Sequence, residues 1–176
     1  GSVKDQKQKR IEFLMNECDL DSSYIQFIIG RCYQMGRGTE KSMEKAFYYY
    51  NLAANQGYIC AGIFLGRFYE NGWAVEKSLE KALYYYELAI KENDYDAYIY
   101  AINLLWENRI DDQKLFFYLK TVIDEGLIGN SKDGSLEYYT RLLADCFKEG
   151  IGCEKSLLQA MSYYRLAVNP KKLFKH

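Results

Sequence analysis

Few residues of this chain have the type and spacing that catalysis needs. The only histidine, His176, is the final residue, which excludes schemes that use histidine as a base or metal ligand. Gly36-Arg37-Gly38-Thr39 resembles part of a phosphate-binding loop, but it lacks a third glycine and a lysine–serine ending, so we interpret it as a turn. The carboxylate pairs Asp111-Asp112 and Asp19/Asp21 lie in polar connections and are more typical of turns and helix caps. We therefore predict no enzyme activity, no catalytic residue, no cofactor and no metal site.

The five cysteines do not have the spacing of a metal site either. Their number is odd and there is no Cys-x-x-Cys pair. We interpret them as buried free thiols in a reducing compartment and expect a cytoplasmic protein. No apolar run approaches the roughly 20 residues that span a bilayer, so we predict no membrane insertion. Gly1-Ser2 is typical of a cloning remnant, so the sequence does not identify the native termini. The cysteines are Cys18, Cys32, Cys60, Cys146 and Cys153.

The charge balance argues against nucleic acid as a partner. Lysine and arginine number 23 against 24 aspartate and glutamate residues, so no basic excess attracts phosphate groups. The chain also has 18 tyrosines, which suggests base stacking as an alternative. Helical spacing places Tyr49-Tyr50 and Tyr85-Tyr86 in a core, however, and only Tyr48 and Tyr84 need face outward.

An internal repeat gives the strongest signal in the sequence. Residues Gly30–Ala53 recur almost letter for letter at Gly66–Ala89, 36 residues later. A fixed period of this length is typical of stacked pairs of helices. In the first copy, Ser23–Met35 and Met43–Asn55 each place apolar residues on one helical face. The single proline, Pro170, leaves such helices uninterrupted.

Glycine and serine mark the ends of these helices. Gly36 follows the last periodic residue of the first helix, as expected for a left-handed stop, and Ser42 precedes the second helix as an N-cap. Small residues at Gly30 and Gly66 let two helices approach closely. Large rings at Tyr33, Tyr69 and Phe147 are expected to fill the space between successive units. These small residues recur in the second helices as Ala46, Ala82 and Ala160.

The array extends beyond the two clear copies. Another copy covers Ser135–Asn169, and a worn copy lies between them at Asp96–Gly126, where the turn between helices is three residues short and lacks its glycine pair. Arg10–Cys18 aligns with the second helix of a preceding unit. We divide the chain into a tag or disordered start (1–7), a capping helix or half repeat (8–20), repeat 1 (22–57), repeat 2 (58–93), degenerate repeat 3 (94–126), an inserted loop (127–135), repeat 4 (136–170) and a tail (171–176).

The repeated residues resemble one known family. The pattern Leu-Gly-x-x-Tyr-x-x-Gly-x-Gly, followed by Lys-Ala-x-x-aromatic-Tyr-x-x-Ala-Ala-x-x-Gly, is similar to the Sel-one-like repeat (SLR), a relative of the tetratricopeptide repeat. It is carried by Ile29-Gly30, Tyr33, Gly36, Gly38, Lys45-Ala46, Tyr49-Tyr50, Ala53-Ala54 and Gly57. The resemblance covers about residues 22–169. It implies an all-α solenoid of αα-hairpins, a right-handed superhelix that holds a partner protein or peptide on its concave side.

The non-core positions of each first helix give the candidate binding stripe. In stacked αα-repeats these helices line the inner surface, and this stripe mixes aromatic side chains with arginines, the residue types enriched at interface hot spots. Arg31 and Arg67, one repeat apart, are suited to a bidentate grip on a carboxylate. The predicted partner-binding residues are Tyr24, Phe27, Arg31, Gln34, Ile63, Arg67, Glu70, Asn103, Trp106, Arg141, Asp145 and Lys148.

Two of these assignments have structural alternatives. Arg31 and Arg67 can instead form ion pairs with Glu40, Glu70 or Glu76 that set the geometry of the repeats. Trp106 is either an anchor for the partner or a plug that fills the space left by missing consensus residues in the worn repeat.

Three functions follow from the sequence, and we favour the first. It is a non-enzymatic adaptor that binds a protein or peptide on the concave face. The second is an accessory segment of a larger enzyme or synthase complex, with which the half repeat at Arg10–Cys18 is compatible. The third, an autonomous enzyme, has no sequence feature in its support. The sequence does not indicate an oligomeric state.

Overall fold

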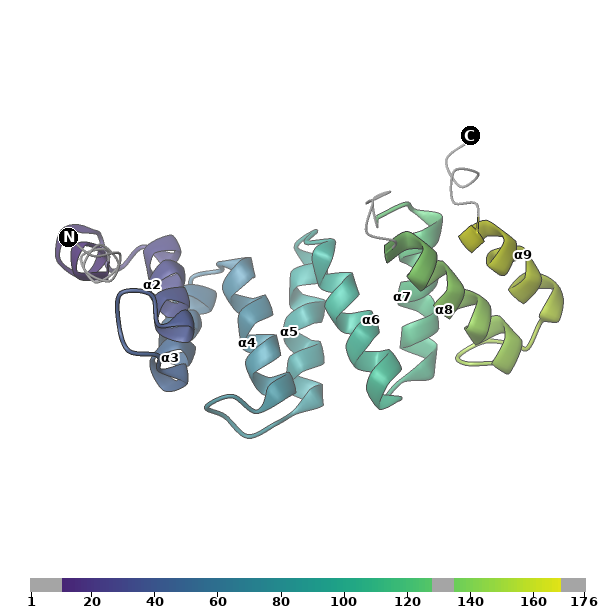
Figure 1. Cartoon of the computed structure of the whole chain (residues 1–176), viewed down its shortest axis with the longest axis horizontal. Helices are drawn as coiled ribbons and strands as arrows, with labels where there is room; N and C mark the ends of the chain where they lie inside the picture. The colour runs from purple at the N-terminus through teal and green to yellow at the C-terminus, as the bar shows by residue number, and fades with distance from the viewer. Residues whose placement is uncertain (1–10, 128–134, 169–176) are drawn as a thin grey trace. The chain divides into compact units, whose positions relative to one another are not determined.

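A computed structural model describes residues 11–127 and 135–168 of the chain. These residues form only helices, turns and loops, and Figure 1 shows the helices in chain order, joined by turns and loops. Residues 11–17 are helical as well. The helices are α2 (Ser23–Met35), α3 (Met43–Asn55), α4 (Ile59–Asn71), α5 (Leu79–Lys91), α6 (Asp96–Asn108), α7 (Asp112–Asp124), α8 (Ser135–Glu149) and α9 (Leu157–Val168).

The helices fall into two compact units. Unit 1 ends at Asp94 and contains α2 to α5, and unit 2 begins at Tyr95 and contains α6 to α9. Within each unit, consecutive helices pack against each other, as expected for stacked αα-hairpins. In unit 1, residues 11–17 cover the open side of α2, because Ile11 and Leu14 are buried against Ile29 and Cys32. The predicted all-α fold of paired helices is confirmed.

The predicted caps position these helices. Ser42 Oγ accepts a hydrogen bond from the Lys45 amide at 3.2 Å, and Ser78 Oγ accepts one from the Lys81 amide at 3.3 Å. Asp111 Oδ1 does the same for the Lys114 amide at 2.9 Å, so it is a cap, as the sequence predicted, and not part of an acid–base pair. Each of these bonds satisfies a donor that the helix leaves open in its first turn.

The close approach of the two helices in a repeat depends on a glycine and a tyrosine. Tyr50 and Tyr86 are fully buried. A Cβ atom on Gly30 would lie 2.8 Å from the Tyr50 ring, and one on Gly66 would lie 2.5 Å from Cε1 of Tyr86. The glycines are therefore required because the tyrosine rings occupy the space that a side chain would take. This confirms the prediction that small residues permit close packing.

Other aromatic rings hold the hairpins together. Tyr33 stacks on Tyr49 at 5.8 Å and Tyr69 stacks on Tyr85 at 5.9 Å, each pair within one repeat. Between repeats 1 and 2, Phe47 meets the edge of Tyr69 at 5.8 Å. The prediction that rings fill the space between successive units is confirmed for Tyr69 and for Phe147, which meets the Phe116 ring at 5.1 Å, whereas the Tyr33 stack closes its own hairpin. The tyrosine runs are thus mainly structural; Tyr48 and Tyr84 are the exposed members, at 58% and 59%.

Repeat 3 solves the same packing problem with different residues. Its register places Ile102 where repeat 2 has Gly66, and Leu119 where repeat 2 has Tyr86. Both Ile102 and Leu119 are fully buried. The small residue has become larger and the large residue smaller, so the two differences from repeat 2 change the side-chain volume in opposite directions.

The short turn of repeat 3 is built on Arg109. This residue adopts the left-handed conformation (φ 52°) that Gly36 and Gly72 adopt in repeats 1 and 2. Its guanidinium donates to both carboxylate oxygens of Asp112 at 2.8 Å and lies 5.7 Å from the centre of the Trp106 ring. The side chain therefore offsets part of the cost of its own backbone strain, which is about 1–2 kcal/mol for a residue with a Cβ.

We expect Arg109→Ala to lower the free energy of unfolding by about 1–2 kcal/mol, because it removes the Asp112 pair and the Trp106 contact and keeps the strained backbone. Arg109→Gly removes the same contacts but also relieves the strain, so it should cost about 1 kcal/mol less than alanine. Urea denaturation of both variants checks this order. A glycine variant less stable than the alanine variant would contradict the role assigned to the turn.

Some predictions concern residues outside the described part. The start (1–7) and the tail (171–176) lie there, as does most of the inserted loop (127–135), whose last residue, Ser135, begins α8.

The five cysteines differ in their exposure to solvent. Cys32 and Cys146 are buried as predicted, whereas Cys60 is exposed and Cys18 and Cys153 are partly exposed. The prediction of uniformly buried thiols was therefore wrong for Cys60.

Candidate protein-binding surface

The first helices of unit 1 present only part of the predicted stripe to solvent. In α2, Tyr24 is 55% exposed and Arg31 is exposed, whereas Phe27 is 7% exposed. In α4, Arg67 is partly exposed, whereas Ile63 is buried, with only 7% of its surface exposed. Phe27 and Ile63 were predicted to face a partner. Their burial removes them from the accessible surface, and that part of the stripe needs correction.

Helix geometry explains this correction. Each residue turns the helix by about 100°, so Arg31 lies within about 20° of Tyr24 around α2. Phe27 lies about 60° to one side, and Gln34 about 80° to the same side. That side of α2 faces α3 of the same hairpin and α4 of the next repeat. The centre of the Phe27 ring lies 5.7 Å from that of Tyr50 in α3 and 5.4 Å from that of Phe64 in α4.

Two polar residues of the stripe bond to the core tyrosines. The Tyr50 hydroxyl donates to Oε1 of Gln34 at 2.6 Å, and the Tyr86 hydroxyl donates to Oε2 of Glu70 at 2.6 Å. A buried hydroxyl needs such a partner because an unsatisfied one costs about 1–3 kcal/mol. Gln34 and Glu70 therefore hold the hairpins closed, and any contact with a partner would be additional to that role.

The two arginines lie over aromatic rings. The Arg31 guanidinium is 6.0 Å from the centre of the Phe27 ring, and that of Arg67 is 5.8 Å from both the Phe64 and the Trp73 rings. Phe27 and Phe64 touch edge to face, so they form one continuous floor beneath both cations. Cation–π contacts of this kind contribute about 0.5–1 kcal/mol at exposed sites and restrict where the guanidinium lies.

The alternative assignment of these arginines was wrong. Among residues 11–127 and 135–168, neither guanidinium lies within 4.0 Å of a carboxylate oxygen, so the ion pairs with Glu40, Glu70 or Glu76 are not formed. The edges of both guanidinium groups, which carry their N–H donors, are available for a carboxylate from another molecule.

The charges of both arginines affect the pKa of the buried Tyr50 hydroxyl. Burial raises the pKa of its hydroxyl, and the positive charges of Arg31 and Arg67 act in the opposite direction on that pKa. Two cations from successive repeats therefore act on one phenol. A carboxylate held between them would meet a field to which both contribute.

Tyr58 belongs to this surface and Trp73 lies beneath it, and both were missed from the sequence. Tyr58 precedes α4 and lies edge-on to Tyr24 at 6.2 Å and 5.0 Å from the Phe27 ring. Trp73 follows α4 in the turn and lies beneath Arg67. Both stand outside the helices from which the stripe was counted, so helical spacing gave no signal for them. We call Tyr24, Arg31, Tyr58 and Arg67 the arginine surface.

In unit 2, the predicted residues mostly have partners within the chain. The Tyr139 hydroxyl donates to Oδ1 of Asn103 at 3.2 Å, and Tyr164 donates to Asp145, a hydrogen bond that raises the pKa of Tyr164 to about 12. Arg141 pairs with Glu137 at 3.3 Å and Lys148 with Glu149 at 3.0 Å, both on the exposed surface. Exposed pairs of this kind are weak, about 0–1 kcal/mol, so they do not prevent either cation from binding elsewhere.

Trp106 has a defined place that combines features of both interpretations. It is partly buried in the last turn of α6, and the Arg109 guanidinium lies over its ring. Its contact with Arg109 ties it to the turn that lacks the usual glycines, and it keeps some exposed area. Its neighbour within unit 2 is Arg109.

Among the described residues, metal-ligating side chains do not form a cluster. No group of three or more histidine, cysteine or carboxylate side chains gathers in the part of the chain that the structure covers. Burial raises the pKa of the Cys146 thiol to about 12, which makes it a poor nucleophile. Within the same ranges, no helix combines the length and apolar character needed to cross a membrane.

Comparison with known proteins agrees with this architecture. A family model described as the Sel1 repeat matches residues 24–58, 63–94 and 138–169, together more than half of the chain. The chain belongs to the Sel1 repeat family. Proteins of this family generally act as scaffolds for protein interactions, and their fold is typically non-catalytic. Repeat 3, in which Ile102 and Arg109 replace the usual glycines, is the one that the family model does not match.

Two solved structures are similar in fold. A Sel1 repeat protein from Oxalobacter formigenes aligns with a TM-score of 0.71 and 22% identity, over 92% of this chain and 64% of its own. A protective antigen with an SLR fold from uropathogenic Escherichia coli aligns with a TM-score of 0.67 and 20% identity, over 97% of this chain and 34% of its own. The chain thus spans less than two thirds of either protein. A search of curated protein sequences gave no match.

Proposed function

We propose that this Sel1 repeat chain is a non-enzymatic adaptor that binds a partner protein through the arginine surface of unit 1. The observation that carries the proposal is the position of Arg31 and Arg67. Each guanidinium is held over an aromatic ring at 5.8–6.0 Å, and neither has a carboxylate partner within the described chain. The segment that fits this surface is an acidic one, with a side-chain or terminal carboxylate between the two arginines.

The aromatic residues around the arginines support the same conclusion. Tyr24 is exposed, and Tyr58 is held against it. Tyrosine and arginine dominate interface hot spots, since each combines a large contact area with a directed polar group. A partner would place its carboxylate between the cations and its apolar side chains against the tyrosine rings. Of the concave stripe that we predicted from the sequence, the proposal keeps Tyr24, Arg31 and Arg67, and it adds Tyr58.

Affinity capture tests the proposal. The immobilised chain should retain a partner from a lysate of the organism that encodes it, and the double variant Arg31→Glu/Arg67→Glu should lose that partner. The matched control, Arg37→Glu/Lys41→Glu, makes the same change in charge at two exposed residues of the turn outside the surface and should retain it. Equal retention by both variants would contradict the arginine surface, and no retained protein would contradict the adaptor role.

A further inference from the structure

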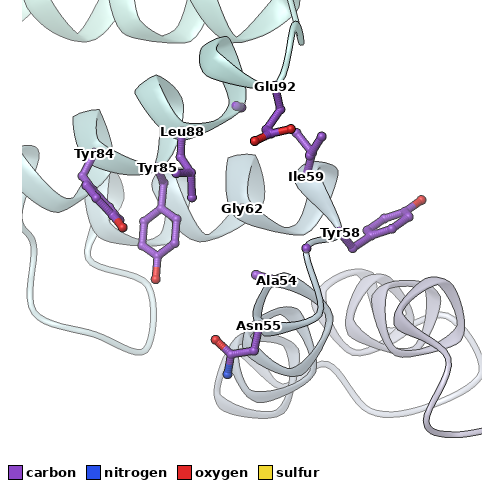
Figure 2. A pocket seen from close by; sticks show the side chains of 11 residues that line it. Ala54, Asn55, Tyr58, Ile59, Gly62, Tyr84, Tyr85, Leu88 and Glu92 are labelled. Atoms are coloured by element: carbon purple, nitrogen blue, oxygen red, sulfur yellow. The ribbon is translucent and has the colours of Figure 1, made fainter.

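Unit 1 has a pocket on the side of its second helices, α3 and α5. Its volume is about 400 Å³, which is within the range of ligand sites. Figure 2 shows Tyr84, Tyr85 and Leu88 projecting from α5 along one side, with Glu92 and Ile59 together at one end. The ring of Tyr58 points away from this pocket, toward the arginine surface. The lining residues are Ala54, Asn55, Gly57, Tyr58, Ile59, Gly62, Tyr84, Tyr85, Leu88, Ala89 and Glu92.

The pocket exists because residue 62 has no side chain. The other repeats place Gln26, Tyr98 and Thr140 at this position of the first helix. Each of these side chains has an internal contact. Gln26 is buried and donates to the Leu20 carbonyl at 2.8 Å, and Thr140 is buried and donates to the Leu136 carbonyl at 2.6 Å. Tyr98 packs edge-on against Tyr118 at 5.4 Å. In repeat 2 that volume is open.

The fold itself does not require a glycine at this position. A Cβ atom on Gly62 would meet only Tyr85 Cδ1, at 3.8 Å, an ordinary contact, whereas one on Gly66 would overlap Tyr86. Glycine within a helix costs about 0.8–1.0 kcal/mol relative to alanine. Gly62 therefore lowers the stability of α4 and, in return, leaves the pocket open.

The lining favours a cationic group beside an apolar one. Glu92 is the one charged side chain among the lining residues. The pocket also meets the last residue of α3, Asn55, and the C-cap of α5, Glu92 itself. Helix C-termini carry partial negative charge, which adds to that of the carboxylate. The exposed Tyr84 and Leu88 (59% and 43%) supply the apolar wall, and a tyrosine ring also attracts a cation.

We propose that this pocket, the Gly62 pocket, binds a basic segment of a protein partner. A bulky apolar side chain lies over Gly62 against Leu88 and Tyr85, and the adjacent arginine or lysine reaches Glu92. The proposal rests on the adaptor role but uses a surface separate from Arg31 and Arg67, with the opposite charge preference. The two surfaces together would let unit 1 hold an acidic and a basic segment on different sides.

Two dipeptides test the pocket by nuclear magnetic resonance on the full chain. Acetyl-leucyl-arginine amide, at millimolar concentration, should shift the backbone amide signals of Gly62, Leu88 and Glu92 with a saturating curve. Acetyl-leucyl-glutamate amide should produce no saturable shift there. Glu92→Gln should weaken binding of the arginine dipeptide about threefold, as expected for one exposed ion pair. Gly62→Leu fills the pocket and should abolish binding without lowering the unfolding temperature.

The outcomes separate this proposal from the arginine surface. Equal binding of both dipeptides, no saturable shift with either, or undiminished binding to a folded Gly62→Leu variant would overturn the Gly62 pocket. The Arg31→Glu/Arg67→Glu variant should bind the arginine dipeptide as the wild type does. Loss of dipeptide binding in that variant would also contradict the assignment of two separate surfaces.

Discussion

Gly152→Ala is expected to lower the free energy of unfolding by about 3–5 kcal/mol, the largest effect of any single substitution considered for this chain. Gly152 lies in the turn before α9 with φ at 68°. A Cβ atom there would stand 1.9 Å from the backbone oxygen of Asp112 and 2.9 Å from Cβ of Phe116. The turn of repeat 4 thus lies directly on the first turn of α7, and a backbone atom cannot move away as the end of a flexible side chain can.

Gly150→Ala separates the two sources of this effect. Gly150 has a similar φ of 75°, but its nearest atoms are 3.6 Å away, so alanine adds only the backbone strain of about 1–2 kcal/mol. Ala74, at the position of repeat 2 that corresponds to Gly152, has a φ of 56°, which shows that alanine can adopt this conformation. Urea denaturation gives both losses, and hydrogen exchange should show the weakened amides in α7 and α8. Equal losses in the two variants would contradict the close contact.

Gly66→Ile is expected to cost about 3 kcal/mol, because the new side chain must occupy space taken by the Tyr86 ring. The ring has no room to move, since Tyr86 is fully buried and its hydroxyl is bound to Glu70. The substitution tests whether the glycine and tyrosine of each repeat form a single packing unit.

A second substitution should recover much of this loss. Tyr86→Leu in the Gly66→Ile background copies the Ile102 and Leu119 pair of repeat 3, and we expect the double variant to regain about 1.5 kcal/mol over Gly66→Ile alone. Tyr86→Leu in the wild-type background is the control and should be destabilising by about 2 kcal/mol, because it leaves a cavity and removes the bond to Glu70. Additive losses in the double variant would show that the two sites do not share one volume.

Much of this fold was predictable because the repeated copies show which positions are equivalent in successive helices. Ser23–Met35 and Met43–Asn55 were predicted from apolar spacing and are α2 and α3. The cap at Ser42 and the exposure of Tyr48 and Tyr84 were predicted as well. These features depend on local sequence and on spacing along one helix, which a repeat displays several times over.

The binding surface was less predictable because it depends on how far each helix is rotated against its neighbours. Helical spacing alone puts Tyr24, Phe27 and Arg31 on the same face of α2. Phe27 is nevertheless buried, because α3 and α4 pack against each other beside it. Tyr58 and Trp73 come from connections, whose paths have no periodic signal. Gly62 looked unremarkable in the sequence, and its importance follows from the side chains that fill the corresponding space in the other repeats.

The most direct test of the adaptor role is the dissociation constant of the captured partner, measured by calorimetry with the wild type and with Arg31→Glu/Arg67→Glu. Two arginines at the centre of an interface should together contribute enough that the double variant binds at least about 100-fold more weakly, with an unchanged unfolding temperature. Arg31→Lys/Arg67→Lys should fall between the two, since lysine keeps the charge and loses the bidentate geometry. A dissociation constant within about threefold of the wild type, in a folded double glutamate variant, would contradict the central claim.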